Sequence, residues 1–211
     1  MIFVESCNLL KTPSEKIARI ISTLFVPPSF ALIIFTYFSF SLEQAPVNTA
    51  VLILATLIFG FGLHIWLFFL FKKKGLIIDL DASIKEERTF PFLIATGFYL
   101  AGLLFLIWFQ INIISIAFWF CYISNTIIVV LVNKYWKISI HAIGASGAAA
   151  ALFIVLGPFA LLALILTLLV GWSRVKLKCH TPMQVIAGTI FGFCSTYLQI
   201  HFIVNWFSHA G

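Results

Sequence analysis

Seven apolar runs constrain the fold of this chain more than any other feature of its sequence. Each run approaches the roughly 20 residues that an α-helix needs to cross a bilayer. Hydrophobic residues make up 62% of the chain and charged residues only 9%, which excludes an ordinary soluble domain. The sequence therefore predicts an all-α fold, a polytopic bundle of about seven transmembrane helices. The runs are Ile17–Phe40, Ala50–Phe71, Phe92–Phe109, Ile113–Val132, His141–Gly157, Phe159–Trp172 and Pro182–Phe207.

Only Gly157 and Pro158 separate the fifth run from the sixth, and both of these runs are short. This dipeptide is typical of a tight reversal between two helices, and one broken helix is the alternative. With a reversal, all 13 Lys and Arg residues fall on the same side of the membrane. By the positive-inside rule we expect that side to be cytoplasmic, in a protein of the bacterial inner membrane.

The chain shows no soluble appendage. We expect one integral membrane domain over residues 1–211, with a short cytoplasmic N-terminal segment at 1–16 and a cytoplasmic loop at 72–91. Thr12-Pro13-Ser14-Glu15 has the pattern of a capping box, which predicts the start of the first helix. Pro27-Pro28 predicts a kink in the first span, because proline lacks the N–H that a helix interior uses.

Small residues predict which spans pack together. Gly188 and Gly192 lie one helical turn apart in the seventh run, and Gly, Ala and Ser residues fill positions 144–151 of the fifth. Such surfaces let helices approach closely, either within one chain or in a dimer. Packing of the fifth and seventh spans would bring His141 and His180 face to face.

Three polar islands stand at the predicted cytoplasmic ends of the spans. In chain order, the first is Lys85 to Arg88, the second is Ser139-Ile140-His141, and the third is Ser173-Arg174 followed by His180. Hydrolysis of a phosphomonoester without a metal needs a nucleophile, a proton donor and cations. The two histidines can fill the first two roles in either order. Arg174, Lys85 and Arg88 can stabilise the phosphate charge, for which the planar fork of arginine is well shaped.

The segment Ser173–His180 resembles the Ser-Arg-(five residues)-His signature of the type 2 phosphatidic acid phosphatase (PAP2) superfamily, whose members are membrane lipid phosphatases. Ile138–His141 stands where that family has Pro-Ser-Gly-His, and Lys85–Pro91 where it has a Lys/Arg-Pro motif; the resemblance covers roughly residues 79–192. It implies a six-helix phosphatase core that uses no metal or other cofactor. It also implies His180 as the nucleophile that forms a phosphohistidine, His141 as the acid for the leaving alcohol, and phosphate ligands at Ser139, Arg174, Lys85 and Arg88.

The sequence departs from this family pattern at three places. Gln184 stands where the family usually has an aspartate that would fix and stabilise the imidazolium. It also closes the pattern Thr181-Pro182-Met183-Gln184, so its alternative role is that of a helix cap. Ile138 and Ile140 replace the Pro and Gly of the second motif. Lys85 and Arg88 are only three residues apart, and the neighbouring acidic residues could neutralise them in a solvated cluster.

These patterns predict a lipid phosphate phosphatase, whose partners are its substrate and the membrane lipids and which has no nucleic-acid partner. The substrate would be a phosphomonoester or terminal pyrophosphate of an isoprenoid or phosphatidate lipid. One alternative is a magnesium-dependent prenyl or lipid-group transferase, suggested by Asp79 and Asp81. The other is a catalytically inactive membrane protein that binds lipid phosphates. For His64, Asn125, Gln199 and His201, polar residues within spans, we expect interhelical hydrogen bonds. His64 lies near the cytoplasmic end of its helix, so its alternative role is to border the site.

Overall fold

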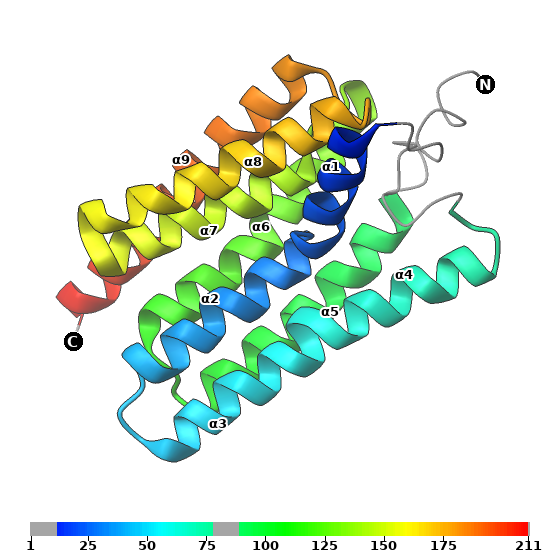
Figure 1. Cartoon of the computed structure of the whole chain (residues 1–211). Helices are drawn as coiled ribbons and strands as arrows, with labels where there is room; N and C mark the ends of the chain where they lie inside the picture. Colours follow the sequence, from blue (N-terminus) through cyan, green and yellow to red (C-terminus); the bar gives the residue numbers. More distant parts are fainter. Residues whose placement is uncertain (1–11, 78–88, 211) are drawn as a thin grey trace.

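The computed structural model describes residues 12–77 and 89–210, and this part of the chain is helical with no strand. A π-helical segment, η2 (Thr56–Gly62), joins α3 to α4, and a 3₁₀ segment, η4 (Gly157–Leu161), joins α7 to α8. The predicted all-α membrane bundle is confirmed (Figure 1). The α-helices are α1 Pro13–Leu24, α2 Pro27–Ser41, α3 Pro46–Ala55, α4 Leu63–Lys73, α5 Thr89–Trp108, α6 Ile113–Tyr135, α7 Ile140–Leu156, α8 Leu162–Lys176 and α9 Pro182–Ala210.

Gly157 marks a reversal of the chain between two antiparallel helices. Among the described residues, five helical units are long and apolar enough to cross a membrane, or six if the bent pair of α1 and α2 counts as one, and one of the five runs from Ile140 to Lys176. Its two halves, α7 and α8, pack side by side, so this unit is a hairpin (Figure 1). Gly157 has a positive φ of 60°, which a residue with a side chain rarely adopts. The reversal predicted at Gly157-Pro158 is therefore present.

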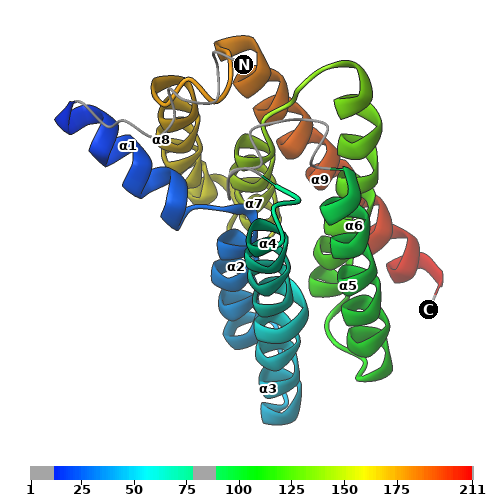
Figure 2. The ribbon, with the colours of Figure 1, turned by 90° about the vertical axis from the view of Figure 1, so that its right-hand side faces the viewer.

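The first predicted span, Ile17–Phe40, is not one helix. Helices α1 and α2 meet at a break where their axes bend by 57°, directly before Pro27-Pro28. The predicted kink is thus confirmed, and it is sharp enough to send α1 away from α2 and against α8 (Figure 2). The predicted capping box of α1 is also present, because Thr12 N–H donates to Glu15 and Glu15 N–H donates to Thr12.

Six helical elements of the described chain form a closed ring, and α7 and α9 pack most tightly within it. Around the ring, α2 contacts α7, α7 contacts α9, α9 contacts α6, α6 contacts α5, and α5 contacts η2, which returns to α2. A Cβ added at Gly192 would lie 2.5 Å from the carbonyl oxygen of Ile143. The glycines of α9 are therefore used for packing against α7 within the chain, as the small-residue pattern predicts.

A hydrogen-bonded cluster joins α6 to α9 in the middle of the bundle. Asn125 Oδ1 accepts from Ser195 Oγ at 2.7 Å and from Gln199 Nε2 at 3.1 Å, and its Nδ2 donates to Thr196 at 3.2 Å. This confirms the interhelical role expected of Asn125 and Gln199. The expectation for His201 is wrong, because its Nε2 lies 3.0 Å from Asn205 Nδ2 on the same helix.

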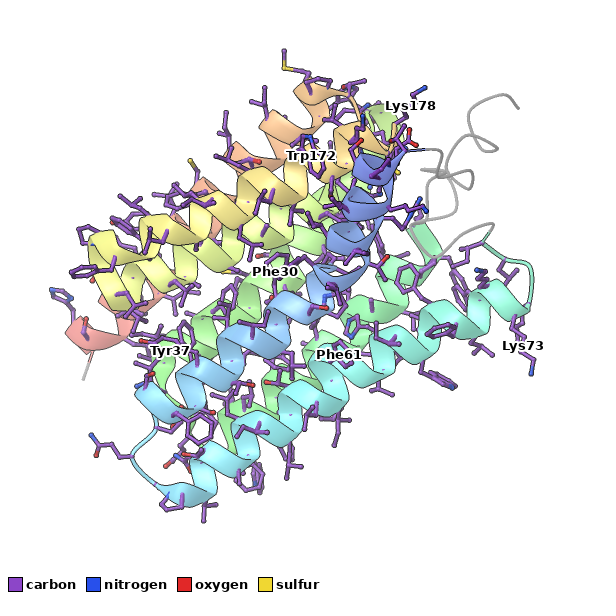
Figure 3. All side chains as sticks on the ribbon, in the orientation of Figure 1. Phe30, Tyr37, Phe61, Lys73, Trp172 and Lys178 are labelled. Carbon is purple, nitrogen blue, oxygen red and sulfur yellow. The ribbon has the colours of Figure 1, made fainter. Side chains whose placement is uncertain are left out.

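The cationic end of the bundle is the end where α4, α6 and α8 finish and α1, α7 and α9 begin. Lys73 and Lys178 both lie at this end in Figure 3, far from Tyr37. The basic residues of the last turns of α4, α6 and α8, namely Lys72, Lys73, Lys134, Arg174 and Lys176, belong to it as well. Both histidine-bearing islands lie here, because His141 opens α7 and His180 precedes α9.

Candidate active site

The turn between α8 and α9 places His180 over the end of α8. Lys178 has a left-handed backbone with φ 55°. Its N–H donates to Val175 O at 2.9 Å, and Cys179 N–H donates to Arg174 O at 3.0 Å, which together form a Schellman turn. The N–H of His180 reaches the same Arg174 carbonyl at 3.3 Å. Arg174 and His180, which stand apart in the sequence, are therefore joined through their backbones.

Gln184 determines which nitrogen of His180 carries the proton. Its Oε1 accepts from Thr181 N–H at 3.1 Å, a position that suits the amide oxygen and not the amide nitrogen. The same oxygen lies 3.1 Å from His180 Nδ1, so Nδ1 carries the proton and donates it. Nε2 then holds the lone pair, as a nucleophilic imidazole requires.

Gln184 also forms the predicted capping box. Its N–H donates to Thr181 Oγ1 at 3.3 Å, while Thr181 N–H donates back to its side chain. The two roles considered for this residue are therefore combined in one side chain. A consequence is that the first turn of α9 offers few N–H groups to an anion, because Pro182 has none and that of Gln184 is already donated.

A backbone hydrogen bond joins the start of α7 to the start of α9. Ser139 N–H donates to Gln184 O at 3.3 Å. Ser139 also caps α7, since its Oγ accepts from Ala142 N–H at 3.4 Å, and it has no exposed surface. His141 follows in the first turn of α7 and is 3% exposed. The structure thus brings the second and third islands together at adjacent helix starts.

Arg174 is the buried cation of this region. It lies in the last turn of α8 and has no exposed surface. Its guanidinium donates to the hydroxyl oxygen of Ser22 on α1. The neighbouring Ser173 instead donates its hydroxyl to Val170 O at 2.7 Å within α8. Of the Ser-Arg pair, the arginine is therefore the residue that extends toward another element.

A cavity of about 320 Å³ extends from His141 into the ring of helices. Its lining comes from both halves of the chain and is mostly apolar, with His64, Phe68, Tyr99, Tyr122 and Gly144 among its residues. The exposed residues of the lining are Thr23 and Phe69. The cavity therefore opens between the α1–α2 break and α4. Its size falls at the lower end of the range typical of small-molecule sites, about 300–1,000 Å³.

Some predicted site residues lie outside the described residues. Lys85 and Arg88 are among these, as are Asp79 and Asp81. Within residues 12–77 and 89–210, no group of three or more His, Cys, Asp or Glu side chains could hold a metal ion. For the described part of the chain, the site therefore rests on the second and third islands.

Sequence reasoning missed Ser22 and the N-terminal part of the cavity lining. The available signal was weak. Ala18 and Ser22 are small residues of α1, and their spacing of four places them on one face of the helix. Nothing in that spacing identifies Arg174 as the partner. Only the bend before Pro27 brings this face onto α8.

One comparison with known proteins matches part of this chain. The family model of the PAP2 superfamily matches residues 122–208, from the middle of α6 to the end of α9. The matched segment contains Ser139, His141, Arg174, His180 and Gln184, and it begins after the Lys85–Pro91 segment. No curated protein and no solved structure matched the chain.

Proposed function

Because residues 122–208 match the family model of the PAP2 superfamily, we propose that this membrane protein is a lipid phosphate phosphatase that works through a phosphohistidine. The observation that carries the proposal is the contact between His180 and Gln184. An imidazole whose Nδ1 proton is held at 3.1 Å by a fixed oxygen presents an unprotonated Nε2. That nitrogen is the attacking atom that phosphoryl transfer to histidine needs.

The residues of the site support a two-step reaction. In the first step Nε2 of His180 would attack phosphorus, a P–N bond would form, and the P–O bond to the lipid alcohol would break. His141 would give its proton to the leaving alkoxide. In the second step His141 would take a proton from water, whose oxygen would attack phosphorus and release inorganic phosphate and His180. Arg174 and the hydroxyl of Ser139 would bind the phosphoryl oxygens.

Gln184 performs only part of the role of an aspartate. Its amide oxygen holds the tautomer of His180, as a carboxylate would, but it carries no charge to stabilise the imidazolium that forms on attack. We therefore expect an active enzyme that is slower than one with a carboxylate at this position.

The cavity beside His141 supports a lipid as the substrate. Its lining is mostly apolar, and its opening lies between Thr23 and Phe69, next to residues that face the surrounding lipid. A tail of the isoprenoid or acyl type would enter through this opening while the phosphate stays at the cationic end. The positive-inside rule supports a cytoplasmic position for that end.

The test is release of inorganic phosphate by the purified protein in detergent with excess EDTA. The panel contains polyprenyl monophosphate, polyprenyl diphosphate, phosphatidate and phosphatidylglycerol phosphate. We expect release from at least one lipid, abolition by His180→Ala, and wild-type rates for His201→Ala, an exposed histidine of α9.

Three outcomes would contradict the proposal. Equal rates for His180→Ala and wild type would remove the mechanism. Activity that appears only with Mg²⁺ would indicate a metal-dependent transferase or hydrolase. Binding of a lipid phosphate with no turnover would indicate an inactive binding protein.

A further inference from the structure

We propose that Ser22 on α1 is a positioning residue for Arg174, so that a helix outside the PAP2-matched segment completes the phosphate site. The inference rests on the proposed function and adds a residue to its site. Ser22 and Arg174 both have no exposed surface, and the guanidinium donates directly to the Ser22 hydroxyl. They stand 152 positions apart in the chain.

The hydrogen bond between Ser22 and Arg174 has a chemical purpose. Arginine has five N–H donors in a rigid planar fork, but its aliphatic stem has many rotamers. A fixed acceptor on one terminal nitrogen restricts these rotamers and so fixes the orientation of the fork. Because serine is neutral, it holds the guanidinium without competing for its charge.

The inner face of α1 contacts the site at a second point. Ala18, one turn before Ser22, has no exposed surface and packs with Leu177 and Cys179. These two residues belong to the turn that places His180. The small side chains of Ala18 and Ser22 let α1 approach both Arg174 and that turn, so α1 supports the cation and the nucleophile together.

The outer face of α1 is apolar. Ile17, Ile20 and Leu24 are each more than half exposed and lie along one stripe. The bend of 57° before α2 turns α1 out of the direction of the bundle, across the end of α8 (Figure 2). An apolar outer face on such a helix suits the boundary between lipid and water.

The test measures binding of inorganic phosphate as well as turnover. Purified protein is unfolded by heat in detergent across phosphate concentrations, and the concentration that gives half of the stabilisation is recorded. We expect Ser22→Ala to raise this concentration by about 10-fold or more, as for loss of a hydrogen bond to a charged group. We expect Ser22→Thr, which keeps the hydroxyl, to bind within a few-fold of wild type.

Two controls separate positioning from packing. Ser39→Ala removes another fully buried serine, whose hydroxyl donates only to Thr36 O of its own helix, and should leave phosphate binding unchanged. In an Arg174→Lys background, which lacks the planar fork, Ser22→Ala should cause little further loss. If Ser22→Ala does not fold, Ser22→Cys keeps the volume with a weaker acceptor and serves in its place.

Wild-type phosphate binding by Ser22→Ala would overturn the inference, and so would an equal loss in both Arg174 backgrounds. Where a lipid substrate is found, we expect Ser22→Ala to raise KM and lower kcat/KM by about 10-fold or more. Ser22-dependent phosphate binding without lipid hydrolysis would refute the proposed function and leave this inference standing. Lipid hydrolysis that Ser22→Ala leaves unchanged would support the proposed function and refute this inference.

Discussion

The helices before the PAP2-matched segment and the helices within it meet at the same end of the bundle, but they supply different things. The segment from α6 to α9 carries His141, Arg174 and His180. A backbone bond joins His180 to Arg174, and another joins Ser139, at the start of α7, to Gln184 of α9. The earlier helices supply Ser22, the opening of the cavity and much of its aromatic wall. The comparison teaches that a compact motif can place reactive groups while more distant helices decide what reaches them.

The largest effect should come from the side chain that orients His180, the proposed nucleophile. Gln184→Leu removes the acceptor for His180 Nδ1, and we expect kcat to fall by roughly 10³- to 10⁴-fold, up to the cost of a wrong tautomer in another hydrolase. Gln184→Glu keeps the acceptor and adds a charge, so it should equal or exceed the wild type. The measurement is phosphate release under single-turnover conditions.

Thr181→Ala is the matched control for that experiment. It removes the other half of the same capping box, at a cost of about 1 kcal/mol in stability, and does not touch His180. A fall in kcat as large as that of Gln184→Leu would show that helix capping, and not orientation of His180, explains the effect.

The next largest effect is a loss of stability, which we compare for one glycine within the PAP2-matched segment and one before it. Gly192→Ala would place a Cβ 2.5 Å from the Ile143 carbonyl oxygen, so α9 would have to move away from α7. We expect a loss of about 1–3 kcal/mol in stability, together with reduced activity. Gly97→Ala in α5 meets nothing within 4 Å and should be neutral or stabilising. Thermal unfolding in detergent measures both, and similar melting temperatures for the two variants would contradict the close packing of α7 and α9.

The smallest effect is expected for the C-terminal turns of α4 and α8, which both lie at the cationic end of the bundle. Helix α4 finishes in a Schellman turn with Gly75 at φ 68°, and α8 finishes in the same turn with Lys178 at φ 55°. Only the first has the residue that this conformation favours. We expect Lys178→Gly to stabilise the protein by about 0.5–1 kcal/mol and Gly75→Lys to destabilise it by about 1 kcal/mol. Chemical or thermal unfolding measures both changes. Changes of the same sign in the free energy of unfolding of the two variants would show that these turns are not equivalent.

Much of the fold could be predicted because its signals are local. The apolar runs, the capping residues Thr12 and Glu15, the prolines before α2 and the reversal at Gly157 each act within a few residues. The signature around His180 is local as well, since a Schellman turn and a capping box are enough to fold it back onto Arg174. These features need no information from the rest of the chain.

The position of α1 could not be predicted, and it changes the composition of the site. Hydropathy treats Ile17–Phe40 as one run, because it averages over residues and does not register direction. Because of the bend of 57°, the first half of that run packs against α8 and the second half belongs to the ring of helices. As a consequence, Ser22 contacts Arg174.

The sequence by itself determined the membrane class, the helix order and the chemical groups of the second and third islands, because hydrophobic length, capping and turn formation are short-range effects. The tertiary structure alone decided that Gln184 serves His180 and the helix cap at once, that the cavity opens beside α4, and that Ser22 meets Arg174. Each of these depends on the angle at which one helix crosses or leaves another. That angle is set by packing between residues far apart in the chain, which no local pattern records.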